Sequence, residues 1–281
     1  MIVITGATGN VGRPLVRELA ASGERVTAVS RAVTAADVPE GVRHLAADLT
    51  EPDGLRPAFD GADALFLHNT GAAAHLVDPH RILAAARAGG VRRVVLLSSQ
   101  GVVTRPGSQS HGGLARAWEE AVRDSGMEWT LLRPGGFASN AYAWAPSVRE
   151  HRAVAAPFGD VGLPVVDPDD IAAVAAAALR EDGHAGREYM LTGPAAVTPR
   201  EQARAIGEAL GEPVGFTEWT REEARAAMGA FMPEPVVETT LAILGEPTGE
   251  ELRVSPDVAR VTGRAPGSFA AWARRNAAAF R

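Results

Sequence analysis

The sequence has no cysteine and no lysine among its 281 residues. Without cysteine the chain can form no disulfide, no thiolate metal site and no thiol nucleophile, and such a composition suits a reducing compartment. Without lysine all 28 basic residues are arginine, so every mechanism that needs a side-chain amine is excluded. Tyrosine is scarce, with only Tyr142 and Tyr189 present, and this limits the groups that could serve as a phenolic acid.

Further absences concern partners and compartment. The net charge is −6 and there is no basic run, so we expect no nucleic-acid partner. The longest apolar runs, such as residues 171–179, are far too short to span a bilayer, so we expect no membrane partner. A strand that starts at Ile2 leaves no room for a signal peptide, which predicts a cytoplasmic protein.

The first half of the chain alternates short apolar runs with helical patterns. Strands separated by helices of this length predict a parallel sheet with helices on both faces. Runs without polar residues, such as Val94-Val95-Leu96-Leu97, indicate strands buried on both sides. The expected fold class is therefore α/β, a Rossmann-type doubly wound parallel sheet. The expected strands are 2–5, 25–30, 64–67, 91–98 and 129–133, and the expected helices are 11–22, 52–59, 78–88 and 113–125.

After about residue 140 the pattern loosens, and proline and glycine become frequent. No repeat or low-complexity linker separates the two halves. We therefore predict a nucleotide-binding domain over residues 1–140 and a smaller substrate-binding lobe over 141–281, packed on the carboxyl edge of the sheet. Helices are expected at 169–180, 199–210, 221–228 and 268–280, with strands near 188–191 and 214–218 that could extend the sheet.

Three glycines at a spacing of three lie between the first strand and the first helix, in Thr5-Gly6-Ala7-Thr8-Gly9-Asn10-Val11-Gly12. Gly6 would allow a tight turn, Gly9 would let backbone approach a pyrophosphate, and Gly12 would let the helix pack closely on the strand. The helix N-terminus would offer free N–H groups and partial positive charge to phosphates. This placement distinguishes the motif from an ordinary glycine-rich turn. The residues expected to bind a cofactor here are Gly6, Thr8, Gly9, Asn10, Val11 and Gly12.

The second strand is followed by no acidic residue, and its end reads Ser30-Arg31. A fold of this type that prefers NAD has an Asp or Glu near this point to hold the ribose 2′-hydroxyl. A guanidinium can bind a 2′-phosphate through two hydrogen bonds, whereas a carboxylate would repel it. We therefore predict that the cofactor is NADP(H), with Ser30 and Arg31 at its 2′-phosphate. The alternative is that Arg31 is only a solvated residue at a strand end.

With these residues the chain resembles the atypical short-chain dehydrogenase/reductases, in particular their NmrA-like and quinone-reductase-like branch. The resemblance extends over nearly the whole chain. Besides the glycine motif, it depends on Ala47-Asp48-Leu49, Leu97-Ser98-Ser99, Glu120 with Ser125-Gly126, residues 129–135, residues 167–172 and Leu191-Thr192-Gly193-Pro194.

The resemblance implies roles for residues outside the glycine motif. Asp48 and Leu49 would border the adenine, and His68, Asn69 and Thr70 would face the nicotinamide ribose. The Pro134-Gly135-Gly136-Phe137 turn would flank the nicotinamide and the substrate. Asp48 could instead only cap a turn. Further residues expected beside the cofactor are thus Pro134, Gly135, Phe137 and Ser98, although Ser98 could only close a strand end.

The acidic residues Asp167, Asp169 and Asp170 resemble a carboxylate metal site. Their position just before an apolar helix is better explained by capping of the helix N-terminus. No cluster of histidines points to a metal either, so we expect none.

Typical members of the wider superfamily protonate a carbonyl with a Tyr-x-x-x-Lys pair and a serine. This chain has no lysine, and the region where the pair would lie, residues 111–120, has no tyrosine. Ser99 is the expected counterpart of the serine, although Gln100 is an equally plausible occupant of that position. His111 could act as a general acid because an unperturbed histidine titrates near neutrality; it could also be merely solvated. The catalytic candidates are Ser99 and His111.

These observations predict an NADPH-dependent reductase of a ketone or quinone that works without a Tyr–Lys proton relay, with assistance from the substrate itself. The alternative is a non-catalytic regulator that senses NADP(H) and acts on a protein partner; an isomerase has no specific support. The oligomeric state is left open. An aromatic or polyketide-like small molecule could be bound by large apolar side chains, each of which could equally be core: Phe137, Tyr142, Trp144, Phe158, Trp219, Met228, Phe231 and Met232.

Overall fold

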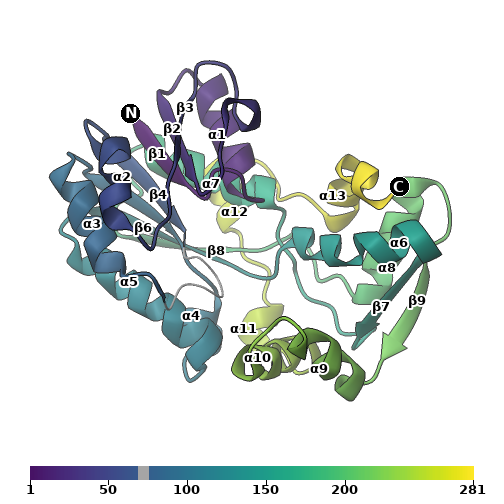
Figure 1. The fold of residues 1–281 in the computed structure, drawn as a ribbon. Helices are drawn as coiled ribbons and strands as arrows, with labels where there is room; N and C mark the ends of the chain where they lie inside the picture. Colours follow the sequence, from purple (N-terminus) through teal and green to yellow (C-terminus); the bar gives the residue numbers. More distant parts are fainter. Residues whose placement is uncertain (69–75) are drawn as a thin grey trace.

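The computed structural model describes residues 1–68 and 76–281, and it contains a parallel sheet with helices on both faces (Figure 1). The order of this seven-stranded sheet is β3-β2-β1-β4-β5-β6-β8. Strands are added outward from β1 in one direction and from β4 in the other, which is the doubly wound Rossmann arrangement, so the predicted fold class is confirmed. The strands are β1 (Ile2–Thr5), β2 (Val26–Ser30), β3 (Arg43–Ala46), β4 (Ala64–His68), β5 (Arg93–Leu97), β6 (Glu128–Pro134) and β8 (Arg187–Leu191).

Helices cover both faces of this sheet because side chains alternate along each buried strand. Phe66 of β4 lies in the core under the helices of one face, and its neighbours Leu65 and Leu67 lie in the core of the other. The first face is covered by α1 (Gly12–Ala21) and α7 (Pro168–Arg180), which pack on each other. The second face is covered by α2 (Pro52–Phe59), α3 (Pro79–Ala88) and α5 (Leu114–Asp124).

The second half of the chain builds a smaller lobe beside the sheet (Figure 1). β7 (Ala153–Pro157) and β9 (Gly215–Trp219) pair in parallel as a separate two-stranded sheet. The predicted strand near 214–218 exists but does not extend the main sheet, because its partner is β7; the strand near 188–191 does extend it, as β8. The core of the lobe is formed by η4 (Ala138–Trp144), α6 (Ala145–His151), α8 (Pro199–Leu210), α13 (Phe269–Arg275) and η5 (Ala277–Phe280).

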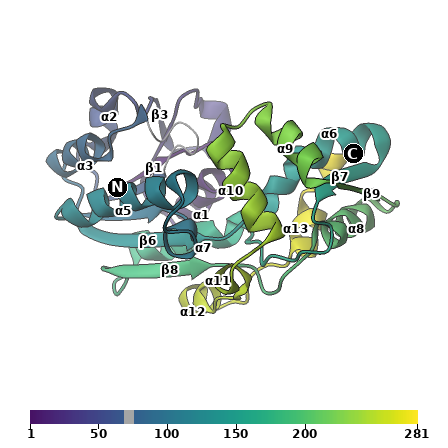
Figure 2. The same ribbon diagram turned by 90° about the horizontal axis from the view of Figure 1, so that it is seen from below.

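A pair of helices, α9 (Arg221–Gly229) and α10 (Glu234–Gly245), has a small core of its own. In the view of Figure 2, α10 crosses between the sheet and the lobe. It packs against η3 (Gln109–Gly113), a turn that precedes α5. Other described elements are η1 (Ala35–Asp37), α4 (Gly101–Thr104), α11 (Gly249–Leu252) and α12 (Asp257–Thr262).

β3 and α10 are among the elements that the sequence patterns did not predict; the others include α4, α6, β7, α11 and α12. β3 is an edge strand with three of its four residues exposed, so it has no apolar run to mark it. The apolar residues of α10 are spread around the helix rather than gathered on one side, so they give little helical period. The helix predicted at 268–280 ends at Arg275 and continues only as the short turn η5.

The division of the chain at residue 140 stays a prediction. α7 and β8 come after that residue, yet α7 packs on α1 and β8 pairs with β6. The second half thus supplies both the lobe and part of the sheet. Throughout the described ranges, no helix combines the length and the apolar character that a membrane span would need.

Candidate functional site

The glycine loop turns tightly between β1 and α1. Gly6 has a φ of +64°, a left-handed conformation that favours glycine. A side chain at Gly12 would place its Cβ 2.1 Å from the Gly6 carbonyl oxygen, so only glycine lets α1 pack this closely on the loop. At Gly9 a Cβ would lie 3.2 Å from the same oxygen, and Gly9 is exposed, so its backbone is open to a ligand. The loop therefore fits a pyrophosphate at the N-terminus of α1.

A pair of hydroxyls joins this loop to the end of β2. Thr8 Oγ1 lies 2.9 Å from Ser30 Oγ. The guanidinium of Arg13, in the first turn of α1, donates to the carbonyl oxygen of Thr8 at 3.3 Å. Arg31 is exposed next to Ser30. The two residues predicted to bind a 2′-phosphate thus lie beside the loop, and Arg13, which sequence reasoning did not single out, lies there too.

Asp48 caps a turn after β3. Its carboxylate accepts hydrogen bonds from the backbone N–H and the hydroxyl of Thr50, both at 2.9 Å. These bonds lower the pKa of Asp48. Leu49 is buried in the core on the α2 side of the sheet. The turn-capping alternative therefore describes the Asp48 side chain, and contact of Asp48 and Leu49 with adenine stays a prediction.

His68 ends β4, and its ring lies over the glycine loop. Its Nδ1 is 3.0 Å from Thr5 Oγ1. Because the Thr5 hydroxyl donates to the Phe66 carbonyl at 3.0 Å, Nδ1–H of the ring is the donor in that pair. A Cβ on Gly6 would lie only 2.8 Å from the ring. Burial, and then the charge of Arg31, lowers the pKa of His68 to about 4, so the ring is neutral near pH 7.

The other predicted contacts of the nicotinamide ribose, Asn69 and Thr70, lie outside the described residues. Whether His68 itself faces that ribose stays a prediction.

Ser98 donates into a buried cluster of charges. Its hydroxyl lies 2.6 Å from Glu119 Oε1, and Arg133 donates to the two oxygens of Glu119 at 2.8 and 2.6 Å. Burial alone would raise the pKa of Glu119, but the hydrogen bonds from Arg133 and Ser98 bring it below its ordinary value. Arg123 and Glu188 extend the cluster. Contact of Ser98 with the cofactor stays a prediction, and its hydroxyl here has a structural partner that sequence reasoning missed.

Ser99 and Gln100 follow β5, and the sequence left open which of them corresponds to the serine of the wider superfamily. Ser99 Oγ accepts from the Gly101 N–H at 3.1 Å and so closes the strand end. Gln100 lies against the turn after β6: a Cβ on Gly135 would be 3.2 Å from Gln100 Oε1. The Gly135 N–H donates to the Leu191 carbonyl at 2.9 Å, which fixes this turn to β8. Gln100 is therefore the one of the two whose side chain adjoins the turn predicted to flank the nicotinamide.

The same turn leads from the sheet into the lobe. Pro134 is the last residue of β6, and Phe137 precedes η4 and forms an isolated bridge with Val166. The Ala138 N–H donates to the Val166 carbonyl at 2.9 Å. Contact of Pro134, Gly135 and Phe137 with a nicotinamide stays a prediction.

His111 is a residue of η3 and lies where η3 packs against α10. Its Nδ1 is 2.9 Å from Ser110 Oγ, and its Nε2 is 3.5 Å from Thr240 Oγ1. Burial lowers the pKa of His111, against the opposing charge of Glu251. The ring is thus a neutral group between hydroxyls, and its role as a general acid stays a prediction.

The two tyrosines have hydrogen-bond partners in the lobe and at the sheet edge. The Tyr142 hydroxyl donates to Asn276 Oδ1 at 2.6 Å, and the Tyr189 hydroxyl lies 2.8 Å from His184 Nδ1. Burial raises the pKa of both phenols. Neither partner belongs to the glycine loop or to the turn after β6.

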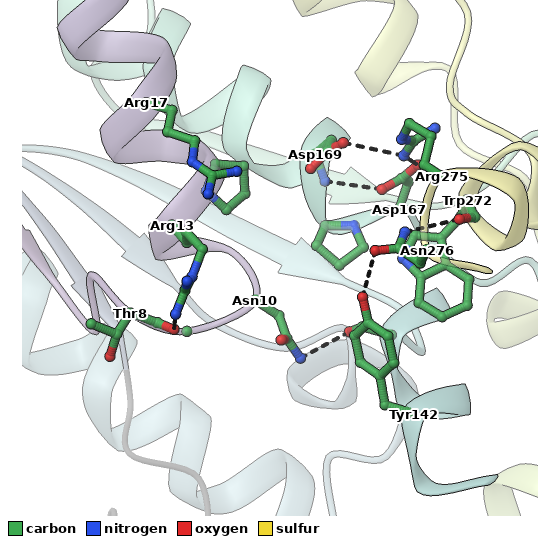
Figure 3. Close-up of a pocket in the computed structure, with 14 residues that line it drawn as sticks. Thr8, Asn10, Arg13, Arg17, Tyr142, Asp167, Asp169, Trp272, Arg275 and Asn276 are labelled. Atoms are coloured by element: carbon green, nitrogen blue, oxygen red, sulfur yellow. Dashed lines mark hydrogen bonds and ion pairs between the residues drawn. The ribbon is translucent and has the colours of Figure 1, made fainter. Parts of the chain in front are cut away.

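A cavity of about 370 Å³ lies between the start of α1 and the lobe (Figure 3). Arg13 and Arg17 line it from α1. Across it, the Asn10 amide donates to Ser139 Oγ of η4 at 3.1 Å, so the loop contacts the lobe directly. This contact could not be read from the sequence, because the two residues are 129 positions apart.

The acidic run at the start of α7 forms the predicted helix cap. Asp167 accepts from the Asp169 N–H at 3.1 Å and forms an ion pair with Arg275, while Asp170 forms one with Arg264. Over residues 1–68 and 76–281, no three His, Asp or Glu side chains are grouped so that they could hold a metal ion.

Comparison with known proteins identifies the family. Residues 6–182 match the model of a family described as NAD(P)H-binding. The chain is 39% identical over 281 residues to the (4-alkanoyl-5-oxo-2,5-dihydrofuran-3-yl)methyl phosphate reductase of Streptomyces griseus, with 100% of this chain and 99% of that protein covered. It is 34% identical over 288 residues to the NAD(P)H azoreductase of Xenophilus azovorans, again with 100% and 99% covered.

Solved structures share the fold. The NADPH-dependent quinone oxidoreductase QOR2 of Escherichia coli, complexed with NADPH, superposes with a TM-score of 0.80 at 25% identity, over 98% of this chain and 99% of that one. NmrA, a negative transcriptional regulator, superposes with a TM-score of 0.74 at 18% identity, over 97% and 94% of the two chains. The second likeness is one of fold alone.

Proposed function

The chain belongs to the NAD(P)H-binding family, among the atypical short-chain dehydrogenase/reductases, and from this we propose that it reduces acceptors whose hydride adduct is a delocalised anion. It is an NAD(P)H-dependent oxidoreductase with NADP(H) as its cofactor, as the glycine loop and Ser30-Arg31 predicted. The acceptor class and the manner of protonation are the parts that we propose.

The bound cofactor would supply a hydride. The loop from Gly6 to Gly12 would hold its pyrophosphate, because the backbone of Gly9 is exposed just before the N-terminus of α1. Ser30 and Arg31 would hold the 2′-phosphate. The turn after β6, with Gln100 against Gly135, would flank the nicotinamide.

The observation that supports the proposed acceptor class is the lack of a free acid at the carboxyl edge of the described sheet. His68 is neutral near pH 7 and its one N–H is donated to Thr5. The Ser99 hydroxyl accepts the Gly101 N–H and is unassisted by a lysine or tyrosine. The two phenols are paired with Asn276 and His184.

Without a strong proton donor the chemistry of the acceptor decides the rate. Addition of hydride to an isolated ketone gives an alkoxide, whereas a phenolate-like anion has a conjugate acid that titrates near 10. The difference is about six pKa units, equivalent to roughly 8 kcal/mol. An acceptor that delocalises the charge therefore needs little help from the protein.

Three kinds of acceptor meet this requirement. A quinone becomes an aromatic hydroquinone anion. In a ketone beside a phenol, the phenol can transfer its proton to the new alkoxide, which leaves a delocalised phenolate. The compound for which the Streptomyces griseus relative is named has a carbon–carbon double bond conjugated with a ring carbonyl and an alkanoyl carbonyl. Hydride addition to the carbon that bears the phosphomethyl group would leave the electron pair between those two carbonyls, and water could then protonate it.

The sequence left open a regulator that binds NADP(H) without turnover, because the absence of a Tyr–Lys pair does not separate the two functions. The similarity to named reductases favours turnover. The two functions differ in one measurable respect, since only a reductase oxidises NADPH beyond one equivalent.

The test uses purified full-length protein with NADPH and four acceptors: 1,4-naphthoquinone, a 3-acyl-2(5H)-furanone, a 2-hydroxyaryl ketone and cyclohexanone. We expect multiple turnovers with the first three and much slower turnover of cyclohexanone. Ser99→Ala, His111→Ala, Tyr142→Phe and Tyr189→Phe should each lose less than the roughly 10²–10⁴-fold that an essential general acid supplies. Fast reduction of cyclohexanone that one of these substitutions abolishes would disprove substrate assistance. Binding of NADPH without turnover of any acceptor would favour the regulator.

A further inference from the structure

We propose that Arg13 is a second cation, besides Arg31, that reads the 2′-phosphate of NADP(H). The inference rests on the proposed binding of that phosphate at the end of β2. Arg13 would be a residue of α1 that determines cofactor specificity. The charge of the residues at the end of β2, from which cofactor preference is predicted in the sequence, gives no sign of it.

The first support is position. Arg13 donates to the carbonyl oxygen of Thr8 at 3.3 Å, and the hydroxyl of the same residue lies 2.9 Å from Ser30 Oγ. Figure 3 shows the Arg13 side chain directed back along α1 toward Thr8. One hydrogen bond thus holds the guanidinium next to the hydroxyl pair that joins the loop to β2. Its other N–H groups remain available, since a guanidinium carries five.

The second support is charge. Most arginines of this protein form ion pairs, but neither Arg13 nor Arg31 has a carboxylate within 4.0 Å among the residues that the structure describes. Two uncompensated guanidinium groups near one hydroxyl suit a dianionic ligand.

The third support is that the two arginines come from different elements. Arg31 is exposed directly after Ser30, the last residue of β2. Arg13 is exposed in the first turn of α1 and is bonded to Thr8, whose hydroxyl meets Ser30. A phosphate at Ser30 would therefore be within reach of a guanidinium from each of the two elements.

Arg17 provides a matched control. It lies one turn farther along α1, lines the same cavity and has no ion pair in the described chain (Figure 3). Unlike Arg13, it makes no hydrogen bond to the loop. Removal of Arg17 takes away the same charge from the same helix without touching the Thr8–Ser30 position.

The test measures affinity rather than activity. Wild type, Arg13→Ala, Arg13→Lys, Arg17→Ala and Arg31→Ala are titrated with NADPH, NADH, 2′,5′-ADP and 5′-ADP by calorimetry or fluorescence. For Arg13→Ala and Arg31→Ala we expect a loss of about 10- to 100-fold toward NADPH and 2′,5′-ADP, the range for a hydrogen bond to a charged group, with NADH and 5′-ADP unchanged. Arg13→Lys should retain part of the affinity, and Arg17→Ala should match wild type.

The outcomes distinguish the role of Arg13 from the binding of a 2′-phosphate at Ser30. If wild type prefers NADPH but Arg13→Ala has no effect, or weakens NADPH and NADH equally, the role of Arg13 is overturned and the preference stands. If Arg17→Ala is as weak as Arg13→Ala, the effect is general helix charge and the role is again overturned. If wild type does not prefer NADPH over NADH, both the role of Arg13 and the binding of a 2′-phosphate at Ser30 fail. Thermal melts of each variant show whether it is folded; Arg13 is exposed, so its removal should leave the melt unchanged.

Discussion

Gly6, Gly9 and Gly12 are glycine for different physical reasons, and only one of these reasons concerns the ligand. Gly6 needs a positive φ, and a Cβ at Gly12 would collide with the Gly6 carbonyl oxygen at 2.1 Å. Gly9 has neither constraint: its Cβ would be 3.2 Å from that oxygen, which a small shift can relieve. Substitution at Gly6 or Gly12 should therefore disturb the fold of the loop, whereas substitution at Gly9 should mainly block a ligand.

Gly9→Val is accordingly expected to abolish binding of NADPH in a protein that still folds, because a branched side chain would stand where backbone meets the pyrophosphate. Titration with NADPH and a thermal melt measure the two effects. Gly54→Val in α2, where a Cβ meets nothing within 4 Å, is the control and should bind normally. Ordinary NADPH binding by folded Gly9→Val would contradict the placement of the pyrophosphate.

The low pKa of His68 predicts how the stability of the protein changes with pH. The unfolded chain takes up this proton near pH 6.5 and the folded chain only near pH 4, so the unfolded state binds more protons between these values. The contribution of neutral His68 to stability is thus present above pH 6.5 and is lost as the pH falls toward 4. The loss is at most about 3.4 kcal/mol, because the two pKa values differ by about 2.5 and each pKa unit corresponds to 1.36 kcal/mol.

Denaturant unfolding at a series of pH values measures this effect. His68→Gln should show a shallower fall in the free energy of unfolding between pH 6.5 and pH 4 than wild type. Equal slopes in the two proteins would mean that the His68 ring takes up its proton in the folded state as readily as in the unfolded one.

At the scale of elements, buried charges join α5 to the far edge of the sheet. Glu119 is fully buried on α5, and Arg133 of β6 bridges it to Glu188 of β8. β8 is supplied by the second half of the chain, so this cluster attaches that strand to a helix of the first half. A buried pair of this kind contributes little net stability. Removal of Glu119, however, would leave the Ser98 hydroxyl and two nitrogens of the Arg133 guanidinium without their buried acceptor, with only the partly exposed Glu188 still paired to Arg133.

Glu119→Ala should therefore destabilise the protein by about 3–5 kcal/mol, which denaturant unfolding can measure. Arg123→Ala removes a half-exposed member of the same cluster and should cost about 1 kcal/mol or less. Similar losses for the two variants would show that the cluster is not held by the buried Glu119–Arg133 pair.

At the scale of the whole molecule, one buried ion pair connects the end of α4 to the helices that cross toward the lobe. Arg105 donates to both oxygens of Glu251 at 2.9 and 2.8 Å, and to the carbonyl of Glu246 at the end of α10 at 2.8 Å. The Glu251 side chain has no exposed surface. The position of α10 over η3 thus depends on residues from distant parts of the sequence.

Arg105→Met should lower kcat/KM for a quinone while the affinity for NADPH stays unchanged, because the glycine loop lies on another part of the chain. It should also lower Tm, since Glu251 would remain buried without a positively charged partner and would keep the hydrogen bond from the Thr248 N–H. Arg253→Met breaks an exposed pair with Glu250 and should leave both quantities near wild type. Equal losses of quinone turnover and NADPH affinity would show that Arg105 supports the whole fold rather than the lobe.

The positions of two parts of the candidate site could be predicted because their information is local, while their contact with the cofactor stays a prediction. The glycine spacing describes a single turn between adjacent elements, and Ser30-Arg31 is fixed by the end of one strand. The strands β1, β4 and β5 were recognisable because burial on both faces demands uninterrupted apolar residues. The start of α7 at Asp167 followed from the need of a helix N-terminus for a cap.

What only the tertiary structure decided involves partners far apart in the sequence. β3 carries no apolar signal and exists because β2 offers it a free edge; β9 has the signal of a strand, but its partner, β7, follows from the way the lobe packs. Ser98 meets Glu119, Asn10 meets Ser139 and Thr8 meets Ser30 only after the chain has folded. Local conformational preference and periodicity act over a few residues and can be read along the chain. The choice of a hydrogen-bond or ion-pair partner depends on which elements the hydrophobic core brings together, and that is settled only in three dimensions.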